Sequence, residues 1–138
     1  MHRILVVDDS ASNRKVLVRS LQQNYEVTTA ENGLEAVELN RKEPFDLILM
    51  DLMMPVMDGI TAIKTIRQDH DESLLPILVL SAVGEKETCV ASFDVGANDF
   101  ILKPFHKNEL LARISVHLLV AQLTRELASK NRRLMEEK

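Results

Sequence analysis

Five side chains that could take part in a reaction or bind a metal each lie at the end of a short apolar run. They are Asp8, Asp9, Asp51, Ser81 and Lys103. Three carboxylates in one place repel one another, so the group needs more positive charge than the ammonium of Lys103 supplies. Carboxylate ligands with no His or Cys beside them in the sequence select a hard divalent cation, Mg²⁺ or alternatively Mn²⁺. Such a cation keeps positions that suit the oxygens of a phosphoryl group.

A pocket of this kind fits phosphoryl transfer to a carboxylate. The reaction needs a nucleophile, a metal that spans the nucleophile and the phosphoryl oxygens, and further donors to those oxygens. We predict that Asp51, which ends the central run, is the nucleophile and forms an acyl phosphate. Asp8 and Asp9 would hold the metal. Lys103 would pair with one phosphoryl oxygen, and the Ser81 hydroxyl would donate a hydrogen bond to another.

The elements that would position these residues are five strand-length apolar runs that alternate with helical patterns. The runs are Ile4–Val7, Tyr25–Thr29, Phe45–Met50, Ile77–Leu80 and Asp99–Leu102. The helical segments are Ser12–Gln23, Leu34–Arg41, Gly59–Gln68, Glu85–Val95 and one that begins near Lys107. This alternation predicts an α/β fold with a doubly wound five-stranded parallel sheet. Ligands of such sheets bind beyond the carboxyl ends of the strands.

Simpler roles remain open for the same residues. Asp51 could be a solvated strand-end residue or the cap of a turn, and Ser81 could be the first hydroxyl of a loop. The convergence of all five side chains on one edge of the predicted sheet favours the chemical interpretation.

Four segments together resemble the receiver domain of two-component response regulators. They are ILVVDDSASNRKVL, DLILMDLMMPVMDG, LSA and DFILKPF, and the match runs from about residue 3 to 118 in the same order and spacing. The resemblance implies a flavodoxin-like sheet of strand order 2-1-3-4-5. It implies that a partner histidine kinase or phosphotransfer protein phosphorylates Asp51, so the chain is a signalling domain and not an enzyme.

The resemblance also implies a role for individual residues. Mg²⁺ would be bound directly by Asp9, Asp51 and the main-chain carbonyl of Met53, and by Asp8 largely through water. Ser81 would be the switch hydroxyl and Phe100 the switch aromatic. Phe100 could instead be an ordinary core residue. Phosphorylation would change the face formed by the fourth helix, the fifth strand and the fifth helix, and Lys103-Pro104 would be a cis peptide.

Two features of the site differ from the commoner receiver pattern. Ser81 stands where Thr is commoner, and Phe100 stands where Tyr is commoner and lacks a hydroxyl, so the switch is expected to be less sharply two-state. Met53 and Val83 flank the pocket with apolar side chains that orient an attacking water poorly. We therefore expect a long-lived phosphoryl group on Asp51.

The C-terminal segment is longer than a receiver needs, and it has no Gly or Pro after Lys107. We predict a receiver domain over residues 1–118 and, over residues 119–138, an extended helix that is a coiled-coil linker to an output domain absent from this chain. The predicted seam is Val116, Val120, Leu123, Leu127, Lys130 and Leu134. Spacings of four and three predict a parallel homodimer. The alternative is a solvated helix that frays beyond about residue 125.

Composition narrows the function classes. The chain has 138 residues, 46% of them hydrophobic, with a net charge of -4 and one cysteine, Cys89. The length fits one domain, the acidic balance argues against direct nucleic-acid binding, and one cysteine excludes an internal disulfide. We expect a cytoplasmic protein without a membrane span. A phosphorylation-independent dimerisation or adaptor module is the alternative function. A hydrolase is a weaker one, because Met53 is not a carboxylate that could act as the acid.

Overall fold

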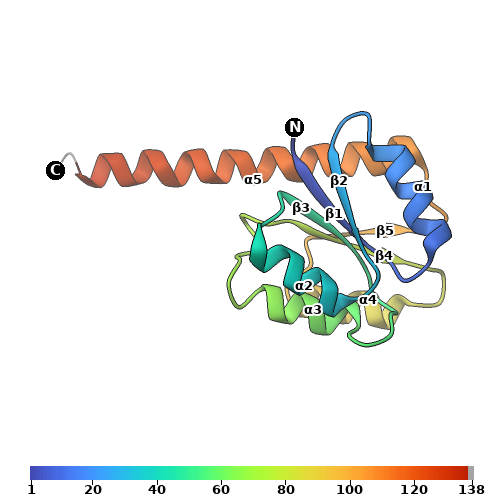
Figure 1. The fold of residues 1–138 in the computed structure, drawn as a ribbon. Helices are drawn as coiled ribbons and strands as arrows, with labels where there is room; N and C mark the ends of the chain where they lie inside the picture. Colours follow the sequence, from blue (N-terminus) through green and yellow to red (C-terminus); the bar gives the residue numbers. More distant parts are fainter. Residues whose placement is uncertain (137–138) are drawn as a thin grey trace.

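Five parallel strands form one sheet in the order β2-β1-β3-β4-β5 in the computed structural model, which describes residues 1–136 (Figure 1). The strands are β1 (Arg3–Val7), β2 (Glu26–Ala30), β3 (Leu47–Asp51), β4 (Ile77–Ser81) and β5 (Asp99–Leu102). The helices are α1 (Ala11–Leu21), α2 (Gly33–Lys42), α3 (Gly59–Ile66), α4 (Lys86–Asp94) and α5 (Lys107–Glu136). The predicted fold class, strand order and extended C-terminal helix are confirmed.

The sheet is covered on both faces. Side chains from β1, β3 and β4 alternate between two hydrophobic clusters, because successive residues of a strand point to opposite faces. One cluster packs against α2, α3 and α4, and the other packs against α1 and α5. Burial on both faces explains why these strands are continuously apolar instead of alternating with polar residues.

Three strands, β2, β3 and β4, end one residue later than the sequence predicts, and in two of them the added residue is a chemically active one. β3 ends at Asp51 and β4 ends at Ser81, because Asp51 pairs in register with Leu80 and Ser81 pairs with Leu102. β3 also begins at Leu47 instead of Phe45, although the Phe45 side chain is still buried in the core. The predicted helix boundaries of α1 to α4 differ from the observed ones by one or two residues. The chemically active residues at these two positions are therefore held by the sheet itself.

Side-chain caps begin two of the helices, α1 and α3, that follow the strands at the functional edge. The Ser10 hydroxyl accepts a hydrogen bond from the Asn13 amide at 3.3 Å and begins α1 two residues after Asp8. The Asp58 carboxylate accepts one from the Thr61 amide at 2.8 Å and begins α3. Capping of this kind supplies a partner for amides that have none within the helix.

The loop between β3 and α3 is tightly folded beneath the functional edge. The Gly59 amide donates a hydrogen bond to the Leu52 carbonyl at 3.0 Å. A Cβ on Gly59 would lie 2.8 Å from the Leu52 Cα and would also meet the Asp51 carbonyl oxygen, so only glycine fits. Val56 in the same loop has a φ of 68°, in the left-handed region that β-branched residues rarely adopt.

The helix α5 leaves the body of the molecule as it proceeds (Figure 1). Leu110, Ile114, Leu118 and Ala121 are buried, and the Arg125 guanidinium donates a hydrogen bond to the Leu74 carbonyl at 2.8 Å. Contacts to the body thus continue past residue 118 without a break in the helix. Among residues 1–136, no helix combines the length and apolar character that crossing a membrane requires.

Candidate functional site

Three carboxylates meet at the carboxyl edge of the sheet. Asp51 is the last residue of β3, and Asp8 and Asp9 directly follow the neighbouring strand β1. One carboxylate oxygen from each of the three lies within 4.8 Å of the others. Asp8 and Asp51 are buried, whereas Asp9 is exposed to solvent. The structure therefore brings together the three acidic residues that the sequence singles out.

Lys103 reaches the same cluster from the residue after β5. Its Nζ lies 3.4 Å from Asp51 Oδ1 and 3.9 Å from Asp8 Oδ2. The Lys103-Pro104 peptide bond is cis, as the sequence predicts. One ammonium thus faces two buried carboxylates and an exposed third one.

The pKa of Asp51 is raised by its surroundings. Burial is the main cause that raises the pKa of Asp51 from 3.8 to about 6, and the negative charge of Asp8 raises it further. The charge of Lys103 and its hydrogen bond lower the pKa of Asp51, as does a hydrogen bond with the Met53 backbone. These contributions do not cancel the rise. A second source of positive charge would favour the ionised carboxylate.

Asp8 is already held by local hydrogen bonds. Its Oδ1 accepts from the Ser10 amide at 2.9 Å, and its Oδ2 accepts from the Asn13 side-chain amide at 3.3 Å. Asn13 was not singled out from the sequence, and its place one turn into α1 is the signal that could have indicated it. Asp8 is thus fixed by local hydrogen bonds, whereas Asp9 faces solvent.

The donor set fits a hard divalent cation. All three nearby acidic groups offer oxygen, which Mg²⁺ and Mn²⁺ prefer, and only the ammonium of Lys103 is paired with the buried carboxylates among the described residues. Asp8, Asp9 and Asp51 are the residues that could hold it.

Comparison with known proteins identifies the family. The chain matches the response regulator receiver domain over residues 4–115. It belongs to the receiver domain family.

Three relatives differ in how much of their length this receiver domain covers. It is 42% identical over 123 residues to the transcriptional regulatory protein ResD of Bacillus subtilis, covering 88% of this chain and 50% of ResD. It is 42% identical over 116 residues to the chemotaxis protein CheY of Bacillus subtilis, covering 83% of this chain and 95% of CheY. The crystal structure of NtrX from Brucella abortus matches 93% of this chain and 29% of NtrX, with a TM-score of 0.86 and 30% identity. The chain thus spans about half of ResD and less of NtrX.

The two predicted switch residues of the receiver lie on the neighbouring strands β4 and β5. Ser81 is buried at the end of β4, and its hydroxyl lies 3.5 Å from the Ala82 carbonyl oxygen. The Phe100 ring is 41% exposed and stands edge-on to the Phe93 ring of α4, with 6.4 Å between centroids. The structure therefore places Phe100 outward and not in the core.

The apolar residues that flank the receiver pocket are exposed. The Met53 and Val83 side chains are 57% and 85% exposed. The predicted long lifetime of the phosphoryl group depends on these two side chains and stays a prediction.

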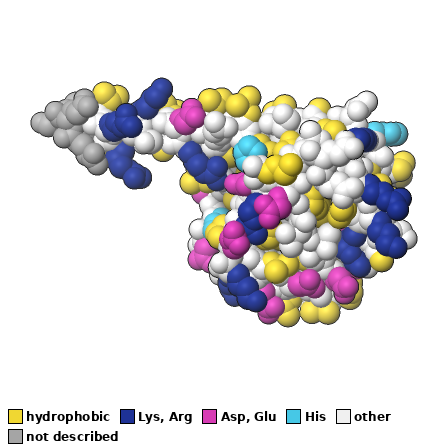
Figure 2. Space-filling view, turned by 45° about the horizontal axis from the view of Figure 1, so that its top comes forward, with side chains coloured by type: hydrophobic (Ala, Val, Ile, Leu, Met, Phe, Trp, Pro, Cys, Tyr) yellow, Lys and Arg dark blue, Asp and Glu magenta, His cyan; other side chains and the backbone are white. Residues whose placement is uncertain are grey.

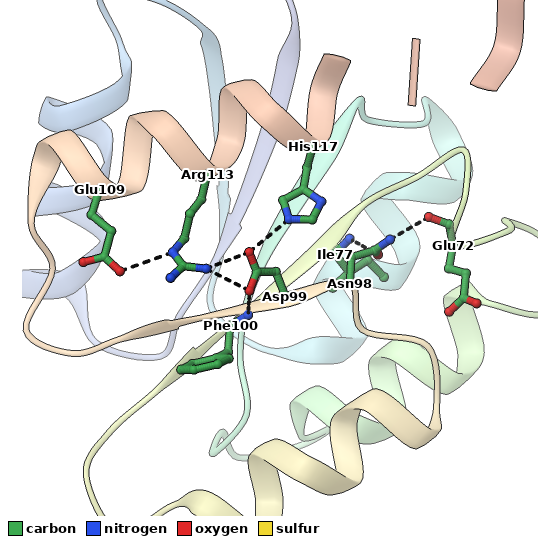
Figure 3. A network of polar contacts seen from close by, with 8 residues as sticks. All are labelled: Glu72, Ile77, Asn98, Asp99, Phe100, Glu109, Arg113 and His117. Atoms are coloured by element: carbon green, nitrogen blue, oxygen red, sulfur yellow. Dashed lines mark hydrogen bonds and ion pairs between the residues drawn. The ribbon is translucent and has the colours of Figure 1, made fainter. Parts of the chain in front are cut away.

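A polar cluster between β5 and α5 was missed from the sequence (Figure 3). Asp99 accepts hydrogen bonds from one Arg113 nitrogen at 2.9 and 3.0 Å, and its Oδ2 lies 3.0 Å from His117 Nε2. Partial burial alone would raise the pKa of Asp99, but the hydrogen bonds from His117, the Phe100 amide and Arg113 lower it. We call Asp99, Arg113 and His117 the Asp99 cluster.

Proposed function

We propose that this receiver domain is a Mg²⁺-dependent phosphoacceptor that switches a signalling protein. The observation that carries the proposal is the meeting of Asp8, Asp9, Asp51 and Lys103 at one edge of the sheet. An Asp51 oxygen attacks the phosphorus of a partner's phosphohistidine, and the P–N bond breaks. The imidazole leaves with the electron pair and takes up a proton. Asp51 is left as an acyl phosphate.

Each residue of the pocket has a role in this proposal. Asp9, Asp51 and the Met53 carbonyl would hold Mg²⁺ directly, and Asp8 would hold it through water. When bound, the cation neutralises charge on the carboxylates and the phosphoryl oxygens. Lys103 pairs with a second phosphoryl oxygen, and Ser81 donates a hydrogen bond to a third.

The partner would be a histidine kinase or a phosphotransfer protein that docks beside Lys103. A hollow of about 620 Å³ lies there, lined by Asn13, Val16, Ala82, Val83, Lys103, Pro104 and Phe105. The exposed side chains of Val16 and Val83 on its rim offer apolar surface to a partner helix. Because such kinases draw their phosphoryl group from ATP, we place this exchange in the cytoplasm.

The output would pass through the face of α4, β5 and α5 and through the projecting part of α5. We propose that this helix forms a parallel homodimer and carries the signal to an attached output domain. Hydrophobic side chains recur along the projecting helix (Figure 2). Val116, Val120, Leu123, Leu127 and Leu134 of the predicted seam are all more than half exposed.

The proposal is tested by the intact mass of the protein after incubation with a small phosphodonor and Mg²⁺. We expect one added phosphoryl group on the wild type, and none on Asp51→Asn or without Mg²⁺. Asp58→Asn is the matched control, because it changes a carboxylate of the adjoining loop to a side chain that caps a helix equally well. A folded wild type that gains no mass, from the small donor or from a phosphorylated partner, would contradict the phosphoacceptor role and favour a phosphorylation-independent adaptor.

A further inference from the structure

The outward-facing ring of Phe100 lies close to a cation on the neighbouring helix α5. The Arg113 guanidinium carbon lies 5.9 Å from the centroid of the Phe100 ring. A guanidinium at this distance from an aromatic ring is attracted to the ring electrons. The same ring borders an apolar pocket of about 330 Å³, which Ser81, Val83, Cys89 and Val90 also line. Phe100 therefore stands between a cation outside and an apolar space beside it.

Arg113 is itself held in place by two carboxylates. Asp99 accepts hydrogen bonds from Arg113 Nη1 at 2.9 and 3.0 Å. Glu109, one turn earlier in α5, accepts a hydrogen bond from Arg113 Nε at 3.2 Å (Figure 3). The Phe100 amide donates to Asp99 Oδ1 at 2.8 Å. One carboxylate thus fixes both the backbone that carries the ring and the cation that faces the ring.

His117 extends the same contact along α5. Its Nε2 lies 3.0 Å from Asp99 Oδ2, so Asp99 joins β5 to two successive turns of the helix (Figure 3). The His117 ring does not take part in the contact between Arg113 and Phe100. It therefore offers a substitution that perturbs the Asp99 cluster without removing the cation.

We propose that Arg113, oriented by Asp99, is a positioning residue that holds Phe100 outward and so sets the resting state of the switch. This inference rests on the proposed phosphoacceptor function. In the switch that the resemblance to receiver domains implies, phosphorylation turns the ring of the switch aromatic inward. An inward turn of Phe100 into the apolar pocket breaks its contact with Arg113, so phosphorylation must work against that contact. Loss of Arg113 shifts the resting population inward and, by linkage, strengthens binding of a phosphoryl mimic.

The test observes Phe100 directly by ¹⁹F NMR. The chain has four phenylalanines, so labelling with 4-fluorophenylalanine gives four signals, and Phe100→Leu identifies the one of interest. Without ligand, we expect Arg113→Gln to move the Phe100 signal toward its position in wild type with Mg²⁺ and beryllium fluoride. The dissociation constant for beryllium fluoride should fall about two- to fivefold, the range of an exposed cation–π contact. Asp99→Asn should act in the same direction.

Two variants separate this role from a general effect on α5. Arg125→Gln makes the same substitution on the same helix outside the cluster, and His117→Gln removes the other partner of Asp99. Both should leave the ligand-free Phe100 signal near its wild-type position. A folded Arg113→Gln protein with an unmoved Phe100 signal and unchanged affinity would overturn the proposal. A wild type that gives no response to beryllium fluoride would instead contradict the phosphoacceptor function on which this inference rests.

Discussion

The carboxylate of Asp51 is buried at the end of β3 with Asp8 beside it, and both features favour its neutral form. A pKa of about 6 in the folded protein, against 3.8 for the ordinary group, gives a penalty on folding that is fully present above about pH 6. The penalty fades as the pH falls toward 3.8, because Asp51 is then protonated in the folded and unfolded states alike. The proposed function thus requires a charge that disfavours folding.

We predict that Asp51→Asn stabilises the protein at pH 7.5 by about 2 kcal/mol in the absence of Mg²⁺, and much less at pH 4. Urea unfolding at the two pH values measures the difference. Mg²⁺ should stabilise the wild type and have little effect on the variant, because it binds the folded state through Asp51. Equal stability of Asp51→Asn and wild type at pH 7.5 would show that Lys103 already balances the charge.

At the scale of elements, the loop from β3 to α3 packs against the backbone of Asp51 and Leu52 at the end of β3. We predict that Gly59→Ala destabilises the fold by about 1–3 kcal/mol, because the added methyl group meets backbone atoms of Asp51 and Leu52 that cannot move independently of β3.

Val56→Asn in the same loop should instead stabilise the fold by about 1 kcal/mol, because Asn tolerates the positive φ. Thermal unfolding measures both variants, and a stable Gly59→Ala would mean that the loop moves freely.

The elements also show what a sequence can and cannot predict. The continuous apolar runs indicated buried parallel strands, and the polar residue after each run indicated the functional edge, because both properties are local in the chain. The Asp99 cluster could not be predicted in this way. Its contacts depend on how α5 is rotated about its axis, which is fixed by the packing of Leu110, Ile114 and Leu118 on the sheet. The outward position of Phe100 depends on the same rotation.

At the scale of the whole molecule, the predicted seam and the receiver lie on opposite sides of α5. Successive residues of a helix are about 100° apart around its axis, so Val120 lies about 200° from the buried Leu118. The same offset relates Leu123 to the buried Ala121. A second helix can therefore pair along the seam without meeting the receiver. Because α5 begins within the folded domain, its projecting part does not bear the cost of helix nucleation.

We predict that the wild type is a dimer and that Leu127→Lys is monomeric, as measured by sedimentation velocity. Ser129→Lys is the matched control, since it adds the same charge two residues along, away from the seam, and should remain dimeric. Lys130→Leu should tighten the dimer at least about tenfold, because it replaces a charge inside the seam with an apolar side chain.

The direction of pairing is decided by one further variant. In a parallel dimer, position 134 of one helix meets position 134 of the other, so Leu134→Cys in a Cys89→Ser background should form an intermolecular disulfide. In an antiparallel dimer the two cysteines lie far apart, and the disulfide does not form. A parallel pair would bring both C-termini to the same end of the dimer. A rotation of α5 at the Asp99 cluster would then change the position of two attached domains in the same way. A wild type that sediments as a monomer would contradict the dimer, and a Leu127→Lys protein that sediments as a dimer would contradict pairing along this seam.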